Sequence, residues 1–400
     1  MRASRHRSTA PILLLSNGHG EDLSGALLGR SLRELGHPVE ALPLVGRGEA
    51  YRRAGIPLLG RTREFSTGGI GYTSLKGRLT ELIQGQVFYL LRQLLRLLRQ
   101  SQRFELIVVV GDVIPVIAAW LAHRPVATYL VAYSSHYEGR LRLPWPCAEL
   151  LASHRFRLVF SRDQLTADDL SQQLKRSVDF VGNPFMDPVL SATERIAATE
   201  PRIGLLPGSR RPELEDNLRL LLKLVENLNS SWELGLDLAL VPSLGDADLM
   251  ALAEGVGWRL EAESLMHGSG LRIQVRRDAF QTVLQQSDLL ICMAGTAAEQ
   301  AVGLAKPVLQ LPGHGPQFTE AFAEAQRRLL GPTVFCAGGK VGSNSNLKAS
   351  ASLAMALVER SRSDATLQRQ CREEAERRLG CAGGGRRMAG LISAVALPQP

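Results

Sequence analysis

Short apolar runs alternate with longer amphipathic stretches along this chain. Runs of Val, Ile and Leu without polar alternation are typical of strands that are covered on both faces, as in a parallel sheet. Amphipathic stretches such as Leu23–Leu35 and Glu213–Asn229 predict helices between them. The runs that predict strands are Ile12–Ser16, Leu106–Val110, Ala127–Val131, Leu158–Phe160, Val178–Val181, Arg202–Leu206, Leu236–Val241, Leu271–Val275, Asp288–Cys292 and Pro307–Leu311.

The pattern of strand and helix restarts near residue 200. It predicts an α/β protein with two Rossmann-like domains facing a cleft. The joint lies near Asn183–Thr199, which contains two X-Pro pairs. We therefore expect an N-terminal domain over residues 11–185 and a C-terminal domain over residues 200–365. Residues 366–400 would form a helical tail, whose last helix we expect to pack back on the N-terminal domain.

Composition and charge narrow the class of protein. Of the 400 residues, 45% are hydrophobic and 22% are charged, which excludes a wholly disordered or collagen-like chain. No uncharged apolar run approaches about 18 residues and no secretory pattern is visible, so we expect no spanning helix or signal. Five cysteines without a CxxC pair favour a reducing cytoplasm. The net charge of +8 resides in residues 1–100, with 15 basic and 7 acidic side chains, which favours an anionic partner there.

The turn Asn17–Asp22 is the first candidate site. In a parallel sheet such a turn lies at the carboxyl ends of the strands, where ligands bind. Gly18 and Gly20 would let the backbone approach a ligand. Alternatively, the two acids of the turn only complement the dipole of the following helix. The candidate general bases here are His19, Glu21 and Asp22.

A second turn opens the C-terminal half. Ser209 would cap the helix that follows, while Arg210 would reach toward the diphosphate of a ligand. Gly208 would give the backbone room in this turn. The alternative is a capped helix with a solvated pair of arginines.

A third turn follows the strand Asp288–Cys292. Its small residues leave room for a ligand, and Glu299 could accept hydrogen bonds from a ribose diol. The alternative is a capping box formed by Thr296 and Glu299, which needs no ligand. The candidate residues of this turn are Gly295, Thr296, Ala297 and Glu299.

Three further positions carry weaker signals. Asp112 follows a strand and is either an acid at the same sheet edge or a helix cap. Asn183 stands at the joint between the halves, where it could contact substrate or support a hinge. Asp246 and Asp248 resemble a metal-holding DxD pair, but a turn before a helix favours Asp anyway, so we expect no metal.

The stretch Leu82–Arg99 is a basic amphipathic helix. Arg92, Arg96 and Arg99 share one face, and four leucines lie broadly opposite. Such a helix suits an anionic membrane surface. The alternative is a domain helix whose apolar face is buried in the core.

In order and spacing, these segments resemble the lipid-A-disaccharide synthase family of glycosyltransferases, roughly over residues 11–330. The resemblance rests on Gly204–Arg210 with Glu213, on Phe180–Pro184, and on Ser287-Asp288 followed by Gly295–Glu299 and Ala305–Pro307. The family has an Asp-x-Pro-Asp-Phe stretch where this chain has Asp112 and Pro115–Ile117, so one carboxylate is missing. The first turn also departs from the family pattern.

The resemblance implies a GT-B fold and transfer of a sugar from a UDP-sugar donor to a lipid-linked or phosphorylated sugar acceptor. It implies an inverting, metal-independent reaction with no cofactor beyond the donor substrate. By matching motif positions, Arg210 would hold the diphosphate and Glu299 the ribose. Gly295 and Thr296 would shape the phosphate turn, and the turn at Gly18 would face the acceptor.

We therefore expect a cytoplasmic enzyme that lies peripherally on the inner face of the cytoplasmic membrane and binds no nucleic acid. Two alternatives remain. One is a UDP-sugar epimerase or hydrolase of the same fold. The other is a nucleotide-sugar-binding protein without catalysis, which the missing carboxylate near Asp112 favours.

Overall fold

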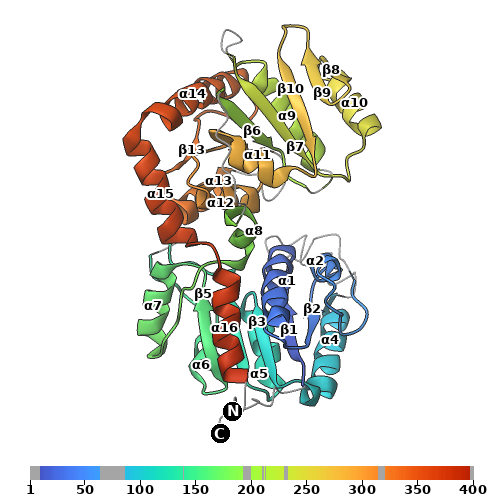
Figure 1. The fold of residues 1–400 in the computed structure, drawn as a ribbon, viewed down its shortest axis with the longest axis vertical. Helices are drawn as coiled ribbons and strands as arrows, with labels where there is room; N and C mark the ends of the chain where they lie inside the picture. Colours follow the sequence, from blue (N-terminus) through green and yellow to red (C-terminus); the bar gives the residue numbers. More distant parts are fainter. Residues whose placement is uncertain are drawn as a thin grey trace, which may run out of the picture. The chain divides into compact units, whose positions relative to one another are not determined.

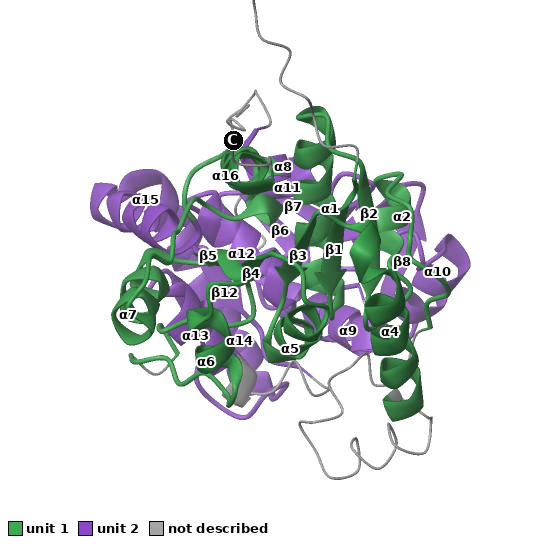
Figure 2. Ribbon diagram, turned by 90° about the horizontal axis from the view of Figure 1, so that it is seen from below, with its two compact units in different colours: residues 1–187, 380–400 green, residues 188–379 purple. Residues whose placement is uncertain are grey.

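The computed structural model describes residues 10–63, 86–137, 139–191, 200–209, 211, 213–228, 233–313 and 320–396. The chain divides into two compact units (Figure 2). Unit 1 comprises residues 1–187 and 380–400, and unit 2 comprises residues 188–379. Each unit is built around its own β-sheet with helices packed on it (Figure 1).

The sheet of unit 1 is entirely parallel, with the strand order β2-β1-β3-β4-β5. Four strands consist of buried residues throughout, or nearly so, and burial on both faces explains the unbroken apolar runs of β1 and β3. The strands are β1 (Ile12–Ser16), β2 (Val39–Pro43), β3 (Leu106–Val110), β4 (Val126–Leu130) and β5 (Phe156–Ser161).

Helices cover both faces of this sheet. On one face, α1 contacts α2 and α16, and their apolar side chains share one core cluster. On the other face α4, α5, α6 and α7 contact one another in that order. The helices are α1 (His19–Glu34), α2 (Glu49–Arg53), α4 (Gln86–Gln100), α5 (Val113–Leu121), α6 (Cys147–Ala152), α7 (Gln164–Leu174) and α16 (Gly384–Ala396), with short turns η2 (Ser101–Arg103) and η3 (Pro184–Met186).

The C-terminal helix α16 packs back on α1, as the sequence led us to expect. Its first turn is held by Asp187, whose carboxylate accepts hydrogen bonds from the N–H groups of residues 383–385 at 2.8–2.9 Å. Its far end is tied by Ser393, whose hydroxyl lies 2.8 Å from a ring nitrogen of His37. Residues at the end of the chain thus complete the first unit.

Unit 2 has an eight-stranded sheet with the order β13-β12-β11-β6-β7-β10-β9-β8. Its first six strands in this order are parallel, and β9 and β8 form an antiparallel edge. The strands are β6 (Arg202–Leu206), β7 (Gly235–Leu240), β8 (Trp258–Glu261), β9 (Ser264–His267), β10 (Arg272–Arg277), β11 (Leu289–Cys292), β12 (Val308–Gln310) and β13 (Val334–Cys336).

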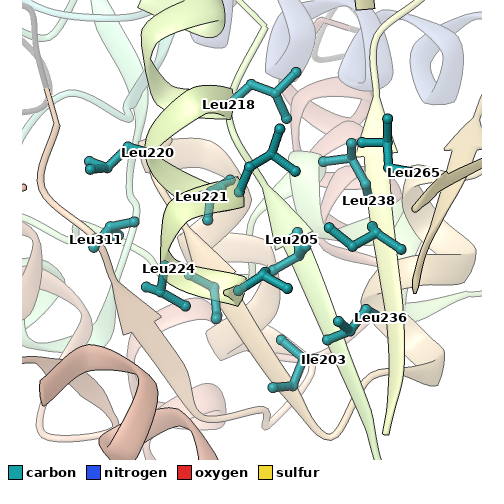
Figure 3. Close-up of a cluster of buried hydrophobic side chains, with 14 of the residues drawn as sticks. Ile203, Leu205, Leu218, Leu220, Leu221, Leu224, Leu236, Leu238, Leu265 and Leu311 are labelled. Atoms are coloured by element: carbon teal, nitrogen blue, oxygen red, sulfur yellow. The ribbon is translucent and has the colours of Figure 1, made fainter. Parts of the chain in front are cut away.

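The core of unit 2 is rich in leucine. Leu218, Leu221 and Leu224 project from α9 onto Leu205 of β6 and Leu238 of β7 (Figure 3). Full burial of one such side chain contributes about 1.5–3 kcal/mol, so this cluster dominates the stability of the unit. Its helices are α9 (Glu213–Val225), α10 (Asp246–Glu254), α11 (Phe280–Gln286), α12 (Gly295–Gly303), α13 (Glu320–Leu330), α14 (Asn344–Ser363) and α15 (Ala365–Leu379), and α8 (Asp187–Leu190) leads in from unit 1.

The sequence pattern is accurate for buried strands and weaker elsewhere. The predicted bounds of β1, β3 and β6 agree with the structure. The predicted strand Val178–Val181 is wrong, because this segment makes only an isolated bridge between Asp179 and Phe160. The pattern also missed β2 and the β8–β9 hairpin, whose short sequences mix polar and apolar residues.

Candidate functional site

The turn after β1 brings three of the predicted bases, His19, Glu21 and Asp22, to the start of α1. The helix begins at His19, four residues earlier than predicted, and Gly18 is its N-cap. A side chain at position 18 would collide with the carboxylate of Glu21, so Glu21 folds back over the turn. The ring of His19 lies beside Gly46 in the loop after β2, 3.3 Å from where a Cβ would stand. His19 is exposed, and Glu21 is half-buried.

Asp22 belongs to a buried hydrogen-bonded chain. Its carboxylate accepts a bond of 2.6 Å from the Ser16 hydroxyl, which in turn accepts a bond of 2.9 Å from the Tyr51 hydroxyl. Burial raises the pKa of Asp22 to about 7, against the lowering effect of the Ser16 bond. Asp22 is 2% exposed, so a substrate would have to reach it through a change at the turn.

Asp112 caps the helix that follows β3. Its carboxylate accepts a hydrogen bond of 2.8 Å from the N–H of Ile114, and this supports the cap interpretation of Asp112. Ser16 and Val110 are register partners in adjacent parallel strands. The turn at Gly18 and Asp112 therefore lie at the same edge of the sheet, as the sequence predicted. The Asn17 side chain lies between them, against Gly111.

Asn183 lies inside unit 1 with no exposed surface. Its amide nitrogen donates to the carbonyl of Arg162 at 2.9 Å, and its amide oxygen accepts a bond from the Tyr129 hydroxyl. These bonds join the ends of β4 and β5 to the start of η3. Both ends of the amide are thus engaged within the protein, which supports a structural role at the joint.

The turn after β6 is shaped by its glycine and by a buried amide. Gly208 has a φ of +104°, a conformation that residues with a side chain rarely adopt. Asn217 of α9 is fully buried and donates to the carbonyl of Pro207 at 2.9 Å. Ser209 is exposed and does not cap α9, because that helix begins four residues later, at Glu213. Arg210, predicted to hold the diphosphate, lies outside the described residues.

Two arginines tie the neighbouring loops of unit 2 together. Arg211 pairs with Glu215 at 2.6 Å and with Asp248 at 3.1 Å. Arg277, at the end of β10, pairs with Asp246 at 2.6 Å. Both acids of the DxD pair are therefore ion-paired to arginines. Within the described ranges, no group of three or more acidic, His or Cys side chains could hold a metal ion.

The turn after β11 opens α12 without a capping box. The N-cap is Ala294, and Gly295 is the first helical residue, so Thr296 stands in the first turn instead of at the cap. The capping-box alternative is therefore wrong, since its geometry requires Thr296 at the N-cap. Thr296 is exposed, Ala297 is buried and Glu299 is half-buried.

The second and third turns are neighbours in space. Leu206 and Cys292 are register partners at the ends of β6 and β11. The N–H of Met293 also donates to the carbonyl of Leu206 at 3.0 Å. Gly208 and Ser209 are thus brought to the same sheet edge as Gly295 and Thr296. The predicted donor residues that are described belong to unit 2, and the candidate bases belong to unit 1.

Sequence reasoning missed three residues that organise these turns. Ser16 and Tyr51 gave no recognisable signal in the sequence, because each is a single polar group among buried neighbours. Asn217 carried a readable signal, since a polar residue there interrupts the apolar stripe of α9 that Leu214, Leu218 and Leu221 form.

Helix α4 keeps part of its apolar face in solvent. Leu97 is buried and Leu94 packs on the core, whereas Phe88 is 76% exposed and Leu91 and Leu95 are each 50% exposed. Val87 and Leu98 are exposed on the same side. Residues 82–85 of the predicted stretch lie outside the described residues. No helix in the described part of the chain is long and apolar enough to cross a bilayer.

Of the three predicted arginines of α4, two project freely. Arg96 donates to Gln93 at 2.6 Å and lies beside Gly60. Arg92 and Arg99 are exposed and form no hydrogen bond or ion pair with other described residues. The face of α4 therefore combines unpaired positive charge with exposed apolar side chains.

Comparison with known proteins gives the fold. The solved calicheamicin glycosyltransferase CalG4 superposes with a TM-score of 0.60 at 17% identity, over 98% of this chain and 100% of that chain. UDP-GlcNAc 2-epimerase from Neisseria meningitidis, solved bound to UDP-GlcNAc, gives a TM-score of 0.52 at 15% identity, over 97% of this chain and 99% of that chain. The chain has a GT-B-like fold. The expected fold class is confirmed.

Sequence comparison adds a distant relative. Over 141 residues the chain is 28% identical to the lipid-A-disaccharide synthase of Geobacter sulfurreducens, and the match covers 33% of each protein. The match thus spans about a third of the length of this curated relative. No family model matches the chain. Over the matched segment, this GT-B-like protein is a distant relative of lipid-A-disaccharide synthase, as the motifs predicted.

Proposed function

We propose that this GT-B-like protein is a glycosyltransferase that moves a sugar from a UDP-sugar to a lipid-linked or phosphorylated sugar acceptor at a membrane surface. The observation that carries the proposal is the local similarity to lipid-A-disaccharide synthase within this fold. The ordered turns at the strand ends of both units support it, because ligands of α/β sheets bind at these edges.

Unit 2 would bind the donor. Gly208 and Gly295 open turns at the ends of adjacent strands, so backbone can approach a diphosphate there. Arg210 would pair with the diphosphate, and Glu299 would accept the ribose hydroxyls. The absence of a capping box supports this role, because Glu299 is not required to cap α12.

Unit 1 would bind the acceptor, with His19 as the base. The acceptor hydroxyl would attack the anomeric carbon, the bond from that carbon to the β-phosphate oxygen would break, and the hydroxyl proton would pass to His19. UDP leaves with the bonding electron pair, and Arg210 and nearby N–H groups stabilise its charge. His19 is favoured over Glu21, Asp22 and Asp112 because it is exposed, whereas Glu21 is half-buried, Asp22 is buried and Asp112 is a helix cap.

Helix α4 would place this acceptor half on an anionic membrane. Exposed Phe88, Leu91 and Leu95 supply apolar area, and Arg92 and Arg99 supply charge beside it. A helix of this kind lies in the interface plane, with its apolar face among the acyl chains and its cations among the headgroups. The protein would then meet a lipid-linked acceptor without crossing the bilayer.

A UDP-sugar 2-epimerase is the second candidate. Solved UDP-GlcNAc 2-epimerases share this fold over nearly the whole chain. A transferase releases UDP only when an acceptor is present. An epimerase converts the UDP-sugar in the absence of lipid.

The test is UDP release from a panel of UDP-sugars, with and without total lipid extract. Arg210→Ala is run beside the wild type, with Arg219→Ala, a half-buried arginine of α9 that pairs with Asp216, as the control arginine in unit 2. We expect UDP release to be stimulated by lipid. Arg210→Ala should lower this release by the factor that corresponds to losing a charged hydrogen bond, which is worth roughly 1.5–3 kcal/mol. Sugar conversion without release would favour the epimerase. UDP binding with neither reaction would favour a non-catalytic binder.

A further inference from the structure

Side chains of α7 hold the short irregular stretch at residues 141–144, between β4 and α6. The N–H of Leu141 donates to Asp169 at 2.6 Å, and its carbonyl accepts from Gln173 at 2.9 Å. Asp169 also accepts from the Ser135 hydroxyl and from Gln173. Burial alone would raise the pKa of Asp169, but these hydrogen bonds and the nearby charge of Arg140 lower it, so the carboxylate stays ionised. Helix α7 thus fixes the path of residues 140–143.

This path presents two arginines outward. Leu141 and Leu143 pack on the core, so Arg140 and Arg142 take the alternate positions and are exposed. Neither arginine makes a hydrogen bond or ion pair with the residues that the structure describes, although the charge of Arg140 acts on the Asp169 carboxylate. Together with Leu141, Leu143, Ala148 and Gln173 they line a cavity of about 370 Å³.

Trp145 stands next to this cavity in the chain and is 83% exposed. It is more exposed than any other large apolar side chain in the described ranges. An indole ring joins a broad apolar surface to one N–H donor, and such rings are enriched where a membrane meets water. In water, this exposure of a Trp side chain leaves a large apolar area unburied.

We propose that this cavity, which we call the Arg140–Arg142 pocket, binds the phosphate headgroup of an anionic membrane lipid while Trp145 enters the interface beside it. Guanidinium groups match phosphate oxygens in geometry and charge. Leu141 and Leu143 give the pocket an apolar wall that suits the glycerol and upper acyl carbons. The proposal rests on the membrane association proposed for unit 1 and does not depend on sugar transfer.

The position of the pocket in unit 1 favours a membrane as the source of the phosphate. Ala148 of the pocket belongs to α6, and α6 lies in the same helical layer as α4, with α5 between them (Figure 2). The layer that carries the exposed apolar face of α4 therefore also carries the pocket. Two separate contacts in one layer would constrain the orientation of unit 1 on the membrane more than the contact of α4 would by itself.

The first experiment measures binding of the full chain to vesicles of phosphatidylglycerol and phosphatidylcholine by co-sedimentation. Arg140→Gln with Arg142→Gln should lower binding by roughly tenfold, because each lost cation weakens attraction to an anionic surface. Arg369→Gln with Arg372→Gln is the matched control, since both arginines are exposed, adjacent on α15 and without a described partner. An equal loss of vesicle binding in both double variants, or no loss in either, would overturn the proposal that the Arg140–Arg142 pocket binds lipid.

The second experiment follows tryptophan emission on the same vesicles. Wild-type emission should shift to the blue as Trp145 leaves water, and Trp145→Phe should abolish the shift. This experiment compares only the wild type and Trp145→Phe, so it remains informative if the double arginine variant fails to fold. An unchanged shift in Trp145→Phe would contradict the placement of this ring in the interface.

The third experiment separates lipid from other phosphates. Glycerol 3-phosphate and a single-stranded RNA are offered to the wild type and to the double arginine variant. We expect little binding of either by the wild type. Arginine-dependent binding of soluble phosphate or RNA, with vesicle binding unchanged, would overturn the lipid assignment. UDP release with a soluble acceptor is measured in parallel, so loss of the pocket and failure of the proposed transferase are told apart.

Discussion

Helices α4 and α9 have similar sequences but pack differently. Both are leucine-rich, amphipathic and begin shortly before a run of apolar residues. Helix α9 buries six leucines against the sheet of unit 2, whereas α4 leaves Phe88, Leu91 and Leu95 largely in solvent. The apolar pattern therefore predicts a helix in both cases, and does not say what covers its apolar face.

The same contrast holds for the acids near the helix starts. Asp22 of α1 is enclosed by Ser16 and Tyr51, while Glu299 of α12 is half-buried. We expect the buried acid to affect the stability of its unit, and the half-buried acid to affect ligand binding. Substitutions in α4 and α9, and at Asp22 and Glu299, can test whether the buried member of each pair affects stability and the more accessible member affects binding.

The largest effect should come from the core helix. Leu221→Ala in α9 should lower the free energy of unfolding by about 2–5 kcal/mol, because it leaves a cavity among buried leucines. Leu95→Ala in α4 should cost less than about 0.5 kcal/mol, since half of that side chain is already in solvent. Urea unfolding measures both, and equal losses would mean that α4 is covered in solution.

The next effect depends on pH. The pKa of Asp22 is raised from 3.8 to about 7 in the folded protein, so folding retains its proton and stability falls as pH rises from about 4 to about 7. Asp22→Asn cannot ionise, so its stability relative to the wild type should rise by about 2–3 kcal/mol from pH 5 to pH 8. If the free energy of unfolding changed with pH in the same way for both proteins, Asp22 would have the same pKa in the folded and unfolded states.

The acid of α12 should affect ligand binding more than folding. Glu299→Ala should weaken UDP binding by about 1.5–3 kcal/mol, the scale of a hydrogen bond to a charged group, with little change in melting temperature. Glu373→Ala is the control, because Glu373 is an exposed acid of α15 that lies outside the predicted donor turns. Calorimetry with UDP measures the first effect, and a lower melting temperature with unchanged affinity would assign Glu299 to the fold.

The smallest effect tests the outer face of α4. Leu91→Gln with Leu95→Gln should weaken binding to anionic vesicles by roughly tenfold, because membrane binding of such helices scales with buried apolar area. The unfolding midpoint should change little, since both side chains are half in solvent. Vesicle binding equal to that of the wild type would mean that this face meets another partner.

Local pattern was sufficient for the strands with unbroken apolar sequences and for the order of the turns. Fully buried parallel strands have unbroken apolar sequences, so β1, β3 and β6 could be bounded from the sequence alone. The motifs around Gly18, Gly208 and Gly295 also fall at strand ends, as their sequence neighbours required.

Only the tertiary structure decided how the candidate residues are used. Asn183 is enclosed by Tyr129 and Arg162, Asp112 caps α5, and Thr296 stands two positions past the N-cap of α12. Each outcome depends on side chains or helix starts that are distant in sequence or shifted by a few residues. A sequence specifies which groups a turn contains, whereas burial and hydrogen-bond geometry arise from packing between segments, and they decide which of those groups are left for chemistry.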